Sequence, residues 1–167
     1  MSHTVHPYSH RLGIIRDWKS RWFLVDRSYR TALKGDLIIR EFLQKELRAN
    51  YIGGLDIERS QKIFRVIIKT SRPGMLIGKS GDGVVKLREK ILKILRKNKV
   101  EVKGQELKVD IEEVRSPESN AAIAAMMVAE SLEKRLPFRR VMKQTIEKVM
   151  ANREVKGIRV RLGGRLG

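Results

Sequence analysis

The spacing of apolar residues changes repeatedly between positions 28 and 112, and this alternation constrains the fold more than any other feature. From 28 to about 50, apolar residues recur every three to five positions, which is typical of one helix face. Residues 55–58 and 64–69 alternate apolar and polar side chains, as half-buried strands do, and their short connection favours an antiparallel hairpin. A second helical pattern over 82–97 and a third strand pattern over 107–112 follow. The chain is therefore predicted to be an α/β protein of the α+β kind. The predicted buried face of the first helix comprises Leu33, Leu37, Ile38, Phe42, Leu43 and Leu47.

A glycine loop, Gly78-Lys79-Ser80-Gly81, lies just before the second long helix. A nucleoside-triphosphate loop would need four residues between its first glycine and the Gly-Lys-Ser motif, but only three separate Gly74 from Gly78. A dinucleotide fingerprint beginning at Gly81 would need a glycine where Lys86 stands. Both nucleotide-binding interpretations therefore fail on spacing.

The same loop fits the Gly-x-x-Gly turn of a K-homology (KH) domain, which clamps the backbone of single-stranded nucleic acid between two helices. The absence of side chains at Gly78 and Gly81 lets a phosphodiester come close, and Lys79 adds a cation. The helix that follows offers its free N–H groups to a phosphate. The predicted order, helix-strand-strand-short helix-loop-helix-strand, is that of a type II KH domain. A helix–helix turn without a ligand is the alternative.

The charge balance indicates a polyanionic partner. Lys and Arg number 37 against 19 Asp and Glu, which gives a formal net charge of +18. Nucleic acid is the commonest partner of such a chain, and an anionic membrane surface is the rival. The longest apolar run, 121–129, is too short to span a membrane, and the N-terminus lacks the layout of a signal peptide. We therefore expect a soluble protein without a membrane partner.

Three basic segments are candidate RNA contacts beside the loop. Arg139, Arg140 and Lys143 share one side of a predicted helix, next to an apolar face of Met142, Ile146 and Val149. The other two segments are the polar face of the helix over 82–97 and the N-terminal arm. Their candidate residues are Lys86, Arg88, Lys90, Lys93, Arg96 and Lys97 on the helix and Arg11, Trp18, Arg21 and Trp22 in the arm. Ordinary solvated helix faces, and an arm that only covers its own domain, are the alternatives.

No constellation for catalysis or metal binding is evident. The chain has no cysteine, which excludes disulfides and thiolate metal sites. Glu112 and Glu113 are adjacent on a predicted strand and point to opposite faces, so they cannot act as an acid–base pair. His3, His6 and His10 have no carboxylate or thiol nearby. We expect no catalytic residues, metal, cofactor or small-molecule substrate, and hence not an enzyme.

Several short motifs occur together along the whole chain. They are His6-Pro7, Arg11-Leu12-Gly13-Ile14, Trp18-Lys19-Ser20-Arg21-Trp22, residues 72–81, Ile111-Glu112-Glu113-Val114, Pro117, residues 132–135, residues 138–143 and Lys156-Gly157-Ile158. In this order they resemble the bacterial form of the third ribosomal protein of the small subunit. Tyr8-Ser9-His10 departs from the family pattern. The family also continues past a Gly-Arg-Leu-Gly-Gly motif, inside which this chain ends at Gly164-Arg165-Leu166-Gly167, so the chain is expected to be C-terminally incomplete.

The resemblance implies a structural role in the head of the small ribosomal subunit. It implies binding to small-subunit ribosomal RNA, contact with neighbouring head proteins, a cytoplasmic location in the ribosome, and a position near the channel where messenger RNA enters. In the family, the stripe that matches Arg139, Arg140 and Lys143 faces messenger RNA. A free-standing KH factor in RNA processing or transcription is the alternative function.

Three segments are expected on this basis. Residues 1–27 form the arm, residues 28–115 form the type II KH domain, and residues 118–167 form a second small α/β domain that is incomplete. This second domain is predicted to begin with two helices, followed by a strand at Ile158 and Val160.

Overall fold

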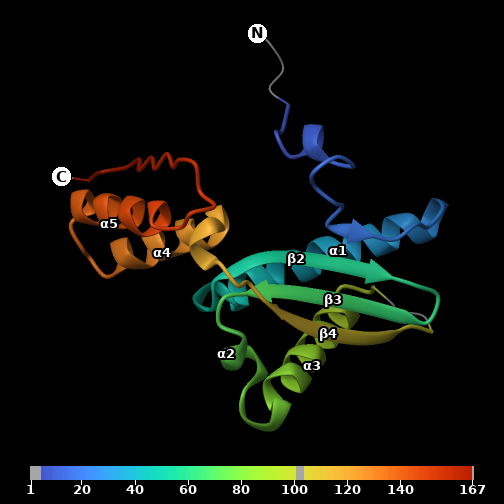
Figure 1. Cartoon of the computed structure of the whole chain (residues 1–167). Helices are drawn as coiled ribbons and strands as arrows, with labels where there is room; N and C mark the ends of the chain where they lie inside the picture. Colours follow the sequence, from blue (N-terminus) through green and yellow to red (C-terminus); the bar gives the residue numbers. More distant parts are fainter. Residues whose placement is uncertain (1–4, 101–103, 167) are drawn as a thin grey trace.

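The computed structural model describes residues 5–100 and 104–166 (Figure 1). His3 and Gly167, which the sequence interpretation named, lie outside the described residues. The elements that the structure contains include four strands, β1 (Ser20–Arg21), β2 (Ile52–Arg59), β3 (Ile63–Thr70) and β4 (Glu106–Glu113). The α-helices are α1 (Asp26–Glu46), α2 (Pro73–Ile77), α3 (Asp82–Lys97), α4 (Ala121–Glu133) and α5 (Phe138–Met150). Short 3-10 turns occur at Ser9–Arg11, Arg48–Asn50, Lys79–Gly81 and Pro117–Ser119.

The strands form one sheet in the order β1-β2-β3-β4. β2 and β3 make the antiparallel hairpin that the sequence predicts, with Ile57 opposite Val66. β4 runs parallel to β3, as the crossover through α2 and α3 requires, and pairs with it from Ile63–Glu106 to Thr70–Glu113. The predicted type II order of elements is therefore confirmed.

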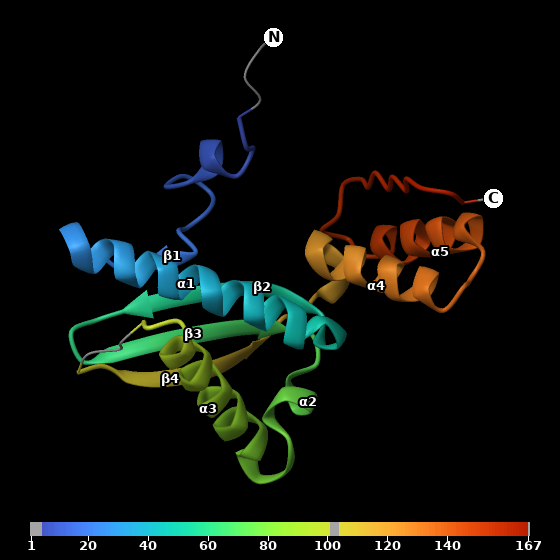
Figure 2. The same ribbon diagram turned by 180° about the vertical axis from the view of Figure 1, so that it is seen from behind.

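Helices α1 and α3 cover one face of this sheet, and Figure 2 shows both in front of it. The alternation along β3 places Phe64, Val66 and Ile68 against the helices, where each is fully buried. Ile39 from α1 and Ile91 from α3 complete this core and are each 1% exposed. The opposite face carries no helix from the described residues (Figure 1). The side chains that alternate onto this face along β2, β3 and β4 are mainly charged.

The arm is tied to the sheet and to α1 by a buried ion pair. Arg59, at the end of β2, donates to Asp36 in α1 over 2.6 Å, and both side chains are almost fully buried. The indole N–H of Trp22 also donates to Asp36, over 2.7 Å. One carboxylate thus joins α1, the hairpin and the arm, and β1 pairs in parallel with β2 at Ile57 and Glu58 just before Trp22.

The predicted buried face of the first helix is partly wrong. The structure leaves Leu33 41% and Leu37 55% exposed, and it buries Ala32, Gly35 and Asp36 instead. The inward face is rotated because Asp36 must meet Arg59, and because Gly35 lets Val100 and Arg59 approach the helix closely. The helix also begins earlier and ends sooner than predicted, at Asp26 and Glu46, with a 3-10 turn continuing to Asn50.

The predicted strand at Ile158 and Val160 is also wrong, because residues 155–163 are irregular. A strand exists only where a neighbour accepts and donates its backbone hydrogen bonds, and no neighbouring strand lies there within the described residues. Instead, Ile158, Val160 and Leu162 line an apolar pocket with Val128 and Leu132 of α4.

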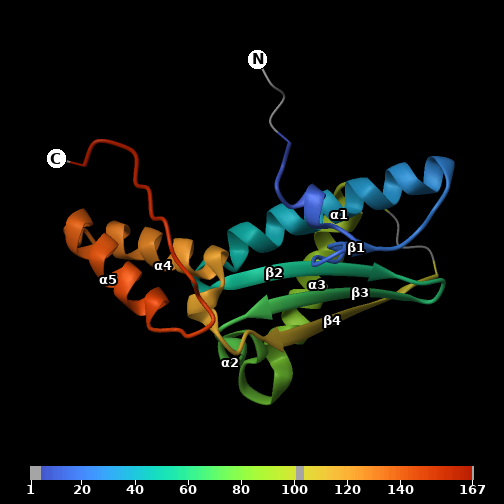
Figure 3. The same cartoon turned by 45° about the horizontal axis from the view of Figure 1, so that its top comes forward.

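The α4–α5 hairpin docks at the end of the sheet where β2 begins (Figure 3). Asn120 caps α4 by accepting from the N–H groups of Ala122 and Ile123, and its side-chain amide donates to Gly53 O over 3.3 Å. Ile123 is fully buried in the junction. Further contacts join Tyr51 with Glu130 and Arg48 with Glu133. Along the described part of the chain, no helix is both long and apolar enough to cross a membrane.

Asp36→Leu should lower the free energy of unfolding by about 3–5 kcal/mol, because it leaves the Arg59 guanidinium buried without its counter-charge. Urea denaturation followed by tryptophan fluorescence measures the change. The double variant Asp36→Leu/Arg59→Met is the control and should recover most of the loss, since it removes both charges. A single variant that loses less than about 1 kcal/mol would show that the pair is not a structural anchor.

Candidate nucleic-acid interface

The glycine loop has a backbone that depends on its glycines. Gly78 lies at φ 69°, ψ −172° and Gly81 at φ 85°, ψ 1°, both in regions that L-residues rarely adopt. Ser80 between them is left-handed as well, at φ 55°, ψ 16°. Gly78, Lys79 and Ser80 are exposed at the tip, which protrudes between α2 and α3 (Figure 1). The loop predicted from sequence is thus an accessible turn that leads directly into the N-terminus of a long helix.

Gly83, in the first turn of α3, is a loop residue that the sequence interpretation missed. A Cβ added there would lie 2.1 Å from Leu76 O and 2.9 Å from Ile77 O, so only glycine allows the end of α2 to pack this closely. Leu76 is buried beneath the turn. A glycine within an otherwise helical pattern was the available signal.

The outer face of α3 continues from the loop as a basic surface. Lys86, Lys93 and Lys97 are exposed, and so are Arg88 and Arg96. Lys90 is also exposed, but it forms an ion pair with Glu46 of α1, which offsets part of its charge. The buried face of the same helix holds Leu87, Ile91 and Leu95. The sequence prediction of a basic outer face is therefore matched in position, with Lys90 the least available of its residues.

Arg72 is a second cation near the loop that the sequence interpretation did not single out as a contact. Its guanidinium lies 4.2 Å from the centre of the Tyr51 ring. Tyr51 is buried, and its backbone is left-handed at φ 51°. The stacking fixes the Arg72 side chain at the start of α2, the short helix that leads into the glycine loop.

Helix α5 exposes the predicted cationic stripe. Arg139, Arg140 and Lys143 are all exposed, and the Arg139 guanidinium lies 5.7 Å from the Phe138 ring centre. The apolar face beside them differs from the prediction. Val141 and Val149 are buried against α4, whereas Met142 is only half-buried and Ile146 is 37% exposed.

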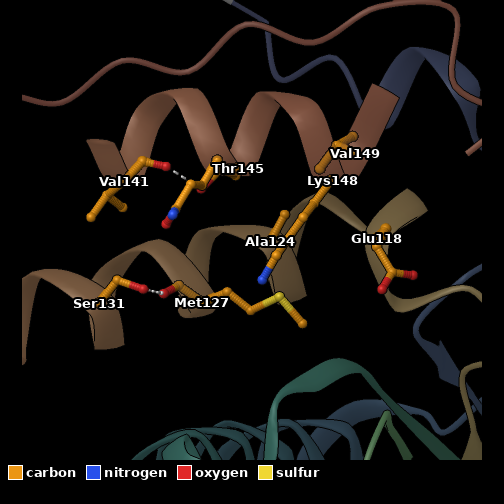
Figure 4. Close-up of a pocket in the computed structure, with 9 residues that line it drawn as sticks. Glu118, Ala124, Met127, Ser131, Val141, Thr145, Lys148 and Val149 are labelled. Carbon is orange, nitrogen blue, oxygen red and sulfur yellow. Dashed lines mark hydrogen bonds between the residues drawn. The ribbon is translucent and has the colours of Figure 1, made fainter. Parts of the chain in front are cut away.

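A cavity of about 50 Å³ lies between α4 and α5 (Figure 4). Its hydroxyl groups are already used, because Ser131 donates to Met127 O and Thr145 donates to Val141 O, each over 2.8 Å. Such bonds to the preceding helical turn hold hydroxyls in place and do not activate them as nucleophiles. The cavity is a packing feature of the helix pair.

The four predicted arm residues divide into two pairs. Arg11 and Trp18 are exposed, whereas Arg21 and Trp22 are held by the protein itself. Arg21 pairs with Glu58 at 2.7 Å and with Asp17 at 2.9 Å. The guanidinium of Arg21, together with the Trp18 N–H, lowers the pKa of the Asp17 carboxyl, and the same pairing raises the pKa of Arg21. The charge of Arg21 is thus largely satisfied within the fold.

The open face of the sheet contrasts with these basic surfaces, because its cations are paired. Arg65 pairs with Asp110 at 3.0 Å and Lys69 pairs with Asp56 at 2.8 Å. Together with the pairs of Arg21, they form one network of ion pairs. Ile67 is only 5% exposed beneath them. Phosphate binding on this face would have to break existing ion pairs, so the unpaired cations of the helical side are more available to a phosphate.

Comparison with known proteins agrees with this arrangement. Residues 38–119 match the family model of the KH domain, and residues 128–167 match that of the ribosomal protein S3 C-terminal domain. The chain belongs to the uS3 family of small ribosomal subunit proteins. Over its full length it is 41% identical to small ribosomal subunit protein uS3 of Photobacterium profundum, of which it covers 69%. It is 38% identical to uS3 of Clostridium novyi and 40% identical to uS3 of Caldicellulosiruptor saccharolyticus, and it covers 72% of each.

Within this uS3-family chain, Lys79→Glu should weaken binding to single-stranded RNA several-fold, because it places a carboxylate where the loop approaches a phosphate. Lys108→Glu, on the open sheet face, is the matched control, since it changes the net charge equally. Fluorescence anisotropy with a labelled oligouridylate measures both variants. If both variants lost affinity equally, RNA binding would depend on the overall charge of the protein and not on a contact at the loop.

Proposed function

We propose that this chain is a structural component of the small ribosomal subunit that binds ribosomal RNA through the glycine loop and the basic faces of its helices. Family membership over the whole chain carries the ribosomal role. The KH domain and a formal net charge of +18 support RNA as the ligand. The residues proposed to contact RNA are Gly78, Lys79, Ser80 and Gly81 in the loop, Lys86, Lys90, Lys93 and Lys97 on α3, and Arg11 and Trp18 in the arm. Arg21 and Trp22, which the sequence also offered as contacts, are instead proposed to hold the arm in place.

The mechanism is neutralisation of phosphates, with little reading of base sequence. The loop provides backbone N–H groups at the start of α3, and α3 extends the contact with exposed lysines. Arg21 and Trp22 act differently from Arg11 and Trp18, because they fix the arm to the sheet and so position the exposed pair. The arm is assigned to residues 1–27, the KH domain to 28–115 and the second domain to 118–167.

The finer placement is in the head of the subunit, in the cytoplasm, beside neighbouring head proteins and the channel where messenger RNA enters. Arg139, Arg140 and Lys143 are the residues proposed to contact messenger RNA. Their support is geometric, because all three are exposed on one side of α5 while Val141 and Val149 anchor the helix. A solvent-exposed cationic stripe on a fixed helix suits a passing phosphate backbone.

A free-standing KH factor is not favoured, because the similarity extends beyond the KH domain into α4, α5 and the following segment. A catalytic role is not part of the proposal either. The relatives are ribosomal proteins, and the hydroxyl groups in the α4–α5 cavity are engaged with backbone carbonyls.

Co-sedimentation tests the ribosomal role directly. The purified chain should be incorporated into small subunits and stay with them through a moderate salt wash, because many phosphate contacts act together. The comparison is with subunits that are first assembled without the chain and only then mixed with it. Complete release at moderate salt would identify a free factor.

Replacing Arg139, Arg140 and Lys143 together with Ala should reduce the log–log salt slope of single-stranded RNA binding by about 0.7 per lost contact, or about 2 for all three. Titration of a labelled RNA at several salt concentrations measures the slope. The triple replacement of Arg65, Lys69 and Lys108 on the sheet face removes the same charge and should leave the slope nearly unchanged. An unaltered slope in the α5 variant would exclude this stripe from the RNA surface.

A further inference from the structure

A groove of about 500 Å³ separates the KH domain from the α4–α5 hairpin. We call it the inter-module groove. Its floor is residues 52–55 at the edge of β2, one wall is Arg40 and Gln44 of α1, and the other wall is Ala122, Ala125 and Ala129 of α4. Figure 3 shows α4 beside the start of β2 and the end of α1. The groove is separate from the glycine loop, the outer face of α3 and the α5 stripe.

The floor of the groove is a sheet edge that is only partly covered. β1 pairs with β2 at Ile57 and Glu58, and Ile57 N–H donates to Lys19 O over 2.9 Å. Backbone groups alternate in direction along a strand, so the N–H and C=O of Leu55 point to the same edge. Arg40 occupies Leu55 O at 2.6 Å, and the arm, which accepts from Ile57 N–H, does not reach Leu55 N–H.

The groove is lined by three cations, and only one of them, Arg48, has an acidic partner, Glu133 of α4. None of the described residues that line it is acidic. Arg40 donates to three neutral oxygens, Leu55 O, Lys19 O and Ser20 Oγ, and forms no ion pair within the described chain. Lys19 has no carboxylate partner there either, and its Nζ lies 4.9 Å from the Tyr8 ring centre. Two half-buried or exposed cations therefore face a cleft that lacks their counter-charge.

The side chains of the α4 wall favour a peptide over an RNA strand as the occupant of the groove. Its alanines, with Met126, are small and apolar, which lets a main chain approach closely but offers no partner to a phosphate. No aromatic side chain lines the groove in the described structure, so bases would find no platform on which to stack. A strand edge, by contrast, is recognised by another peptide strand.

We propose that the inter-module groove receives an extended, acidic segment of a neighbouring protein. The segment lies along the β2 edge, accepts a hydrogen bond from Leu55 N–H, and places carboxylates against Arg40 and Lys19. Its small apolar side chains face the alanine wall of α4. The source of the segment rests on the proposed ribosomal role, in which neighbouring proteins surround this chain.

Cross-linking in the assembled particle tests the proposal. Photoreactive benzoylphenylalanine replaces Ala122 in the full chain, which is then reconstituted into small subunits and irradiated. The expected adduct, identified by mass spectrometry, is a protein segment rich in Asp and Glu. An adduct to ribosomal RNA, an adduct to a basic or neutral segment, or no adduct would overturn it. Benzoylphenylalanine in place of Ala151, which is exposed just after α5, is the matched control.

A binding measurement keeps the test decisive if the substituted chain fails to assemble. The probe is a labelled peptide of about ten residues that alternates Glu and Val. Ala122→Trp, which fills the groove, should weaken its binding about tenfold, whereas Ala151→Trp should not. Both variants should bind oligouridylate like the parent chain. Equal effects of the two substitutions, or no binding of the peptide to the parent chain, would overturn the proposal that the groove binds an acidic segment. Neither outcome would affect the co-sedimentation result, and hence the ribosomal role would stand.

Discussion

The buried pair of Asp36 and Arg59 is the interaction on which the positions of the arm, α1 and the sheet depend. Burying two charges is costly unless each is fully hydrogen-bonded, and here the carboxylate receives the guanidinium, the Trp22 indole and, at 3.4 Å, the Ser20 hydroxyl. Arg59 is further held 3.7 Å from the Phe64 ring centre. The pair therefore specifies one arrangement of three segments that are distant in sequence. Because Trp22 and Ser20 both bond to Asp36, the same pair also fixes where the arm meets the edge of β2.

Charge is distributed over the fold in two different ways. On the open sheet face, cations and anions alternate across neighbouring strands and satisfy one another, as with Glu58 between Arg21 and Arg65. On α3 and α5, by contrast, most cations have no acidic partner among the described residues. Exposed ion pairs contribute little to stability, but they remove a face from competition for phosphate. On the proposed function, the ion pairs of the sheet face leave the helical side as the surface whose cations are available to RNA.

Local patterns predicted most of the fold, and tertiary contacts explain where they failed. The hairpin, the third long strand and the glycine loop followed from periodicity and from glycine spacing, because these depend on neighbouring residues, whereas the parallel direction of β4 came from the structure. The exposure of Leu33 and Leu37 did not, because the inward face of α1 is chosen by Asp36, whose partner lies 23 residues away. The strand predicted at Ile158 failed for lack of a pairing neighbour, and β1 was missed because two residues carry no period. Arg72 could be identified only when the structure placed it on Tyr51.

The geometry of the glycine loop bears on how much it contributes to binding. Three constraints fix the backbone conformation of the loop. They are the positive φ of Gly78 and Gly81, the left-handed Ser80, and the close packing of Gly83 against the end of α2. Leu76, at the end of α2 just before the turn, is buried and anchors this side of the loop. The turn is therefore preorganised, and binding RNA need not order it, which reduces the entropic cost of association. A preorganised turn with a single lysine can fix the path of one phosphodiester, whereas the more numerous cations of α3 add affinity along that path. On the proposed function, the loop sets the register of the RNA and the helical faces supply most of the binding free energy.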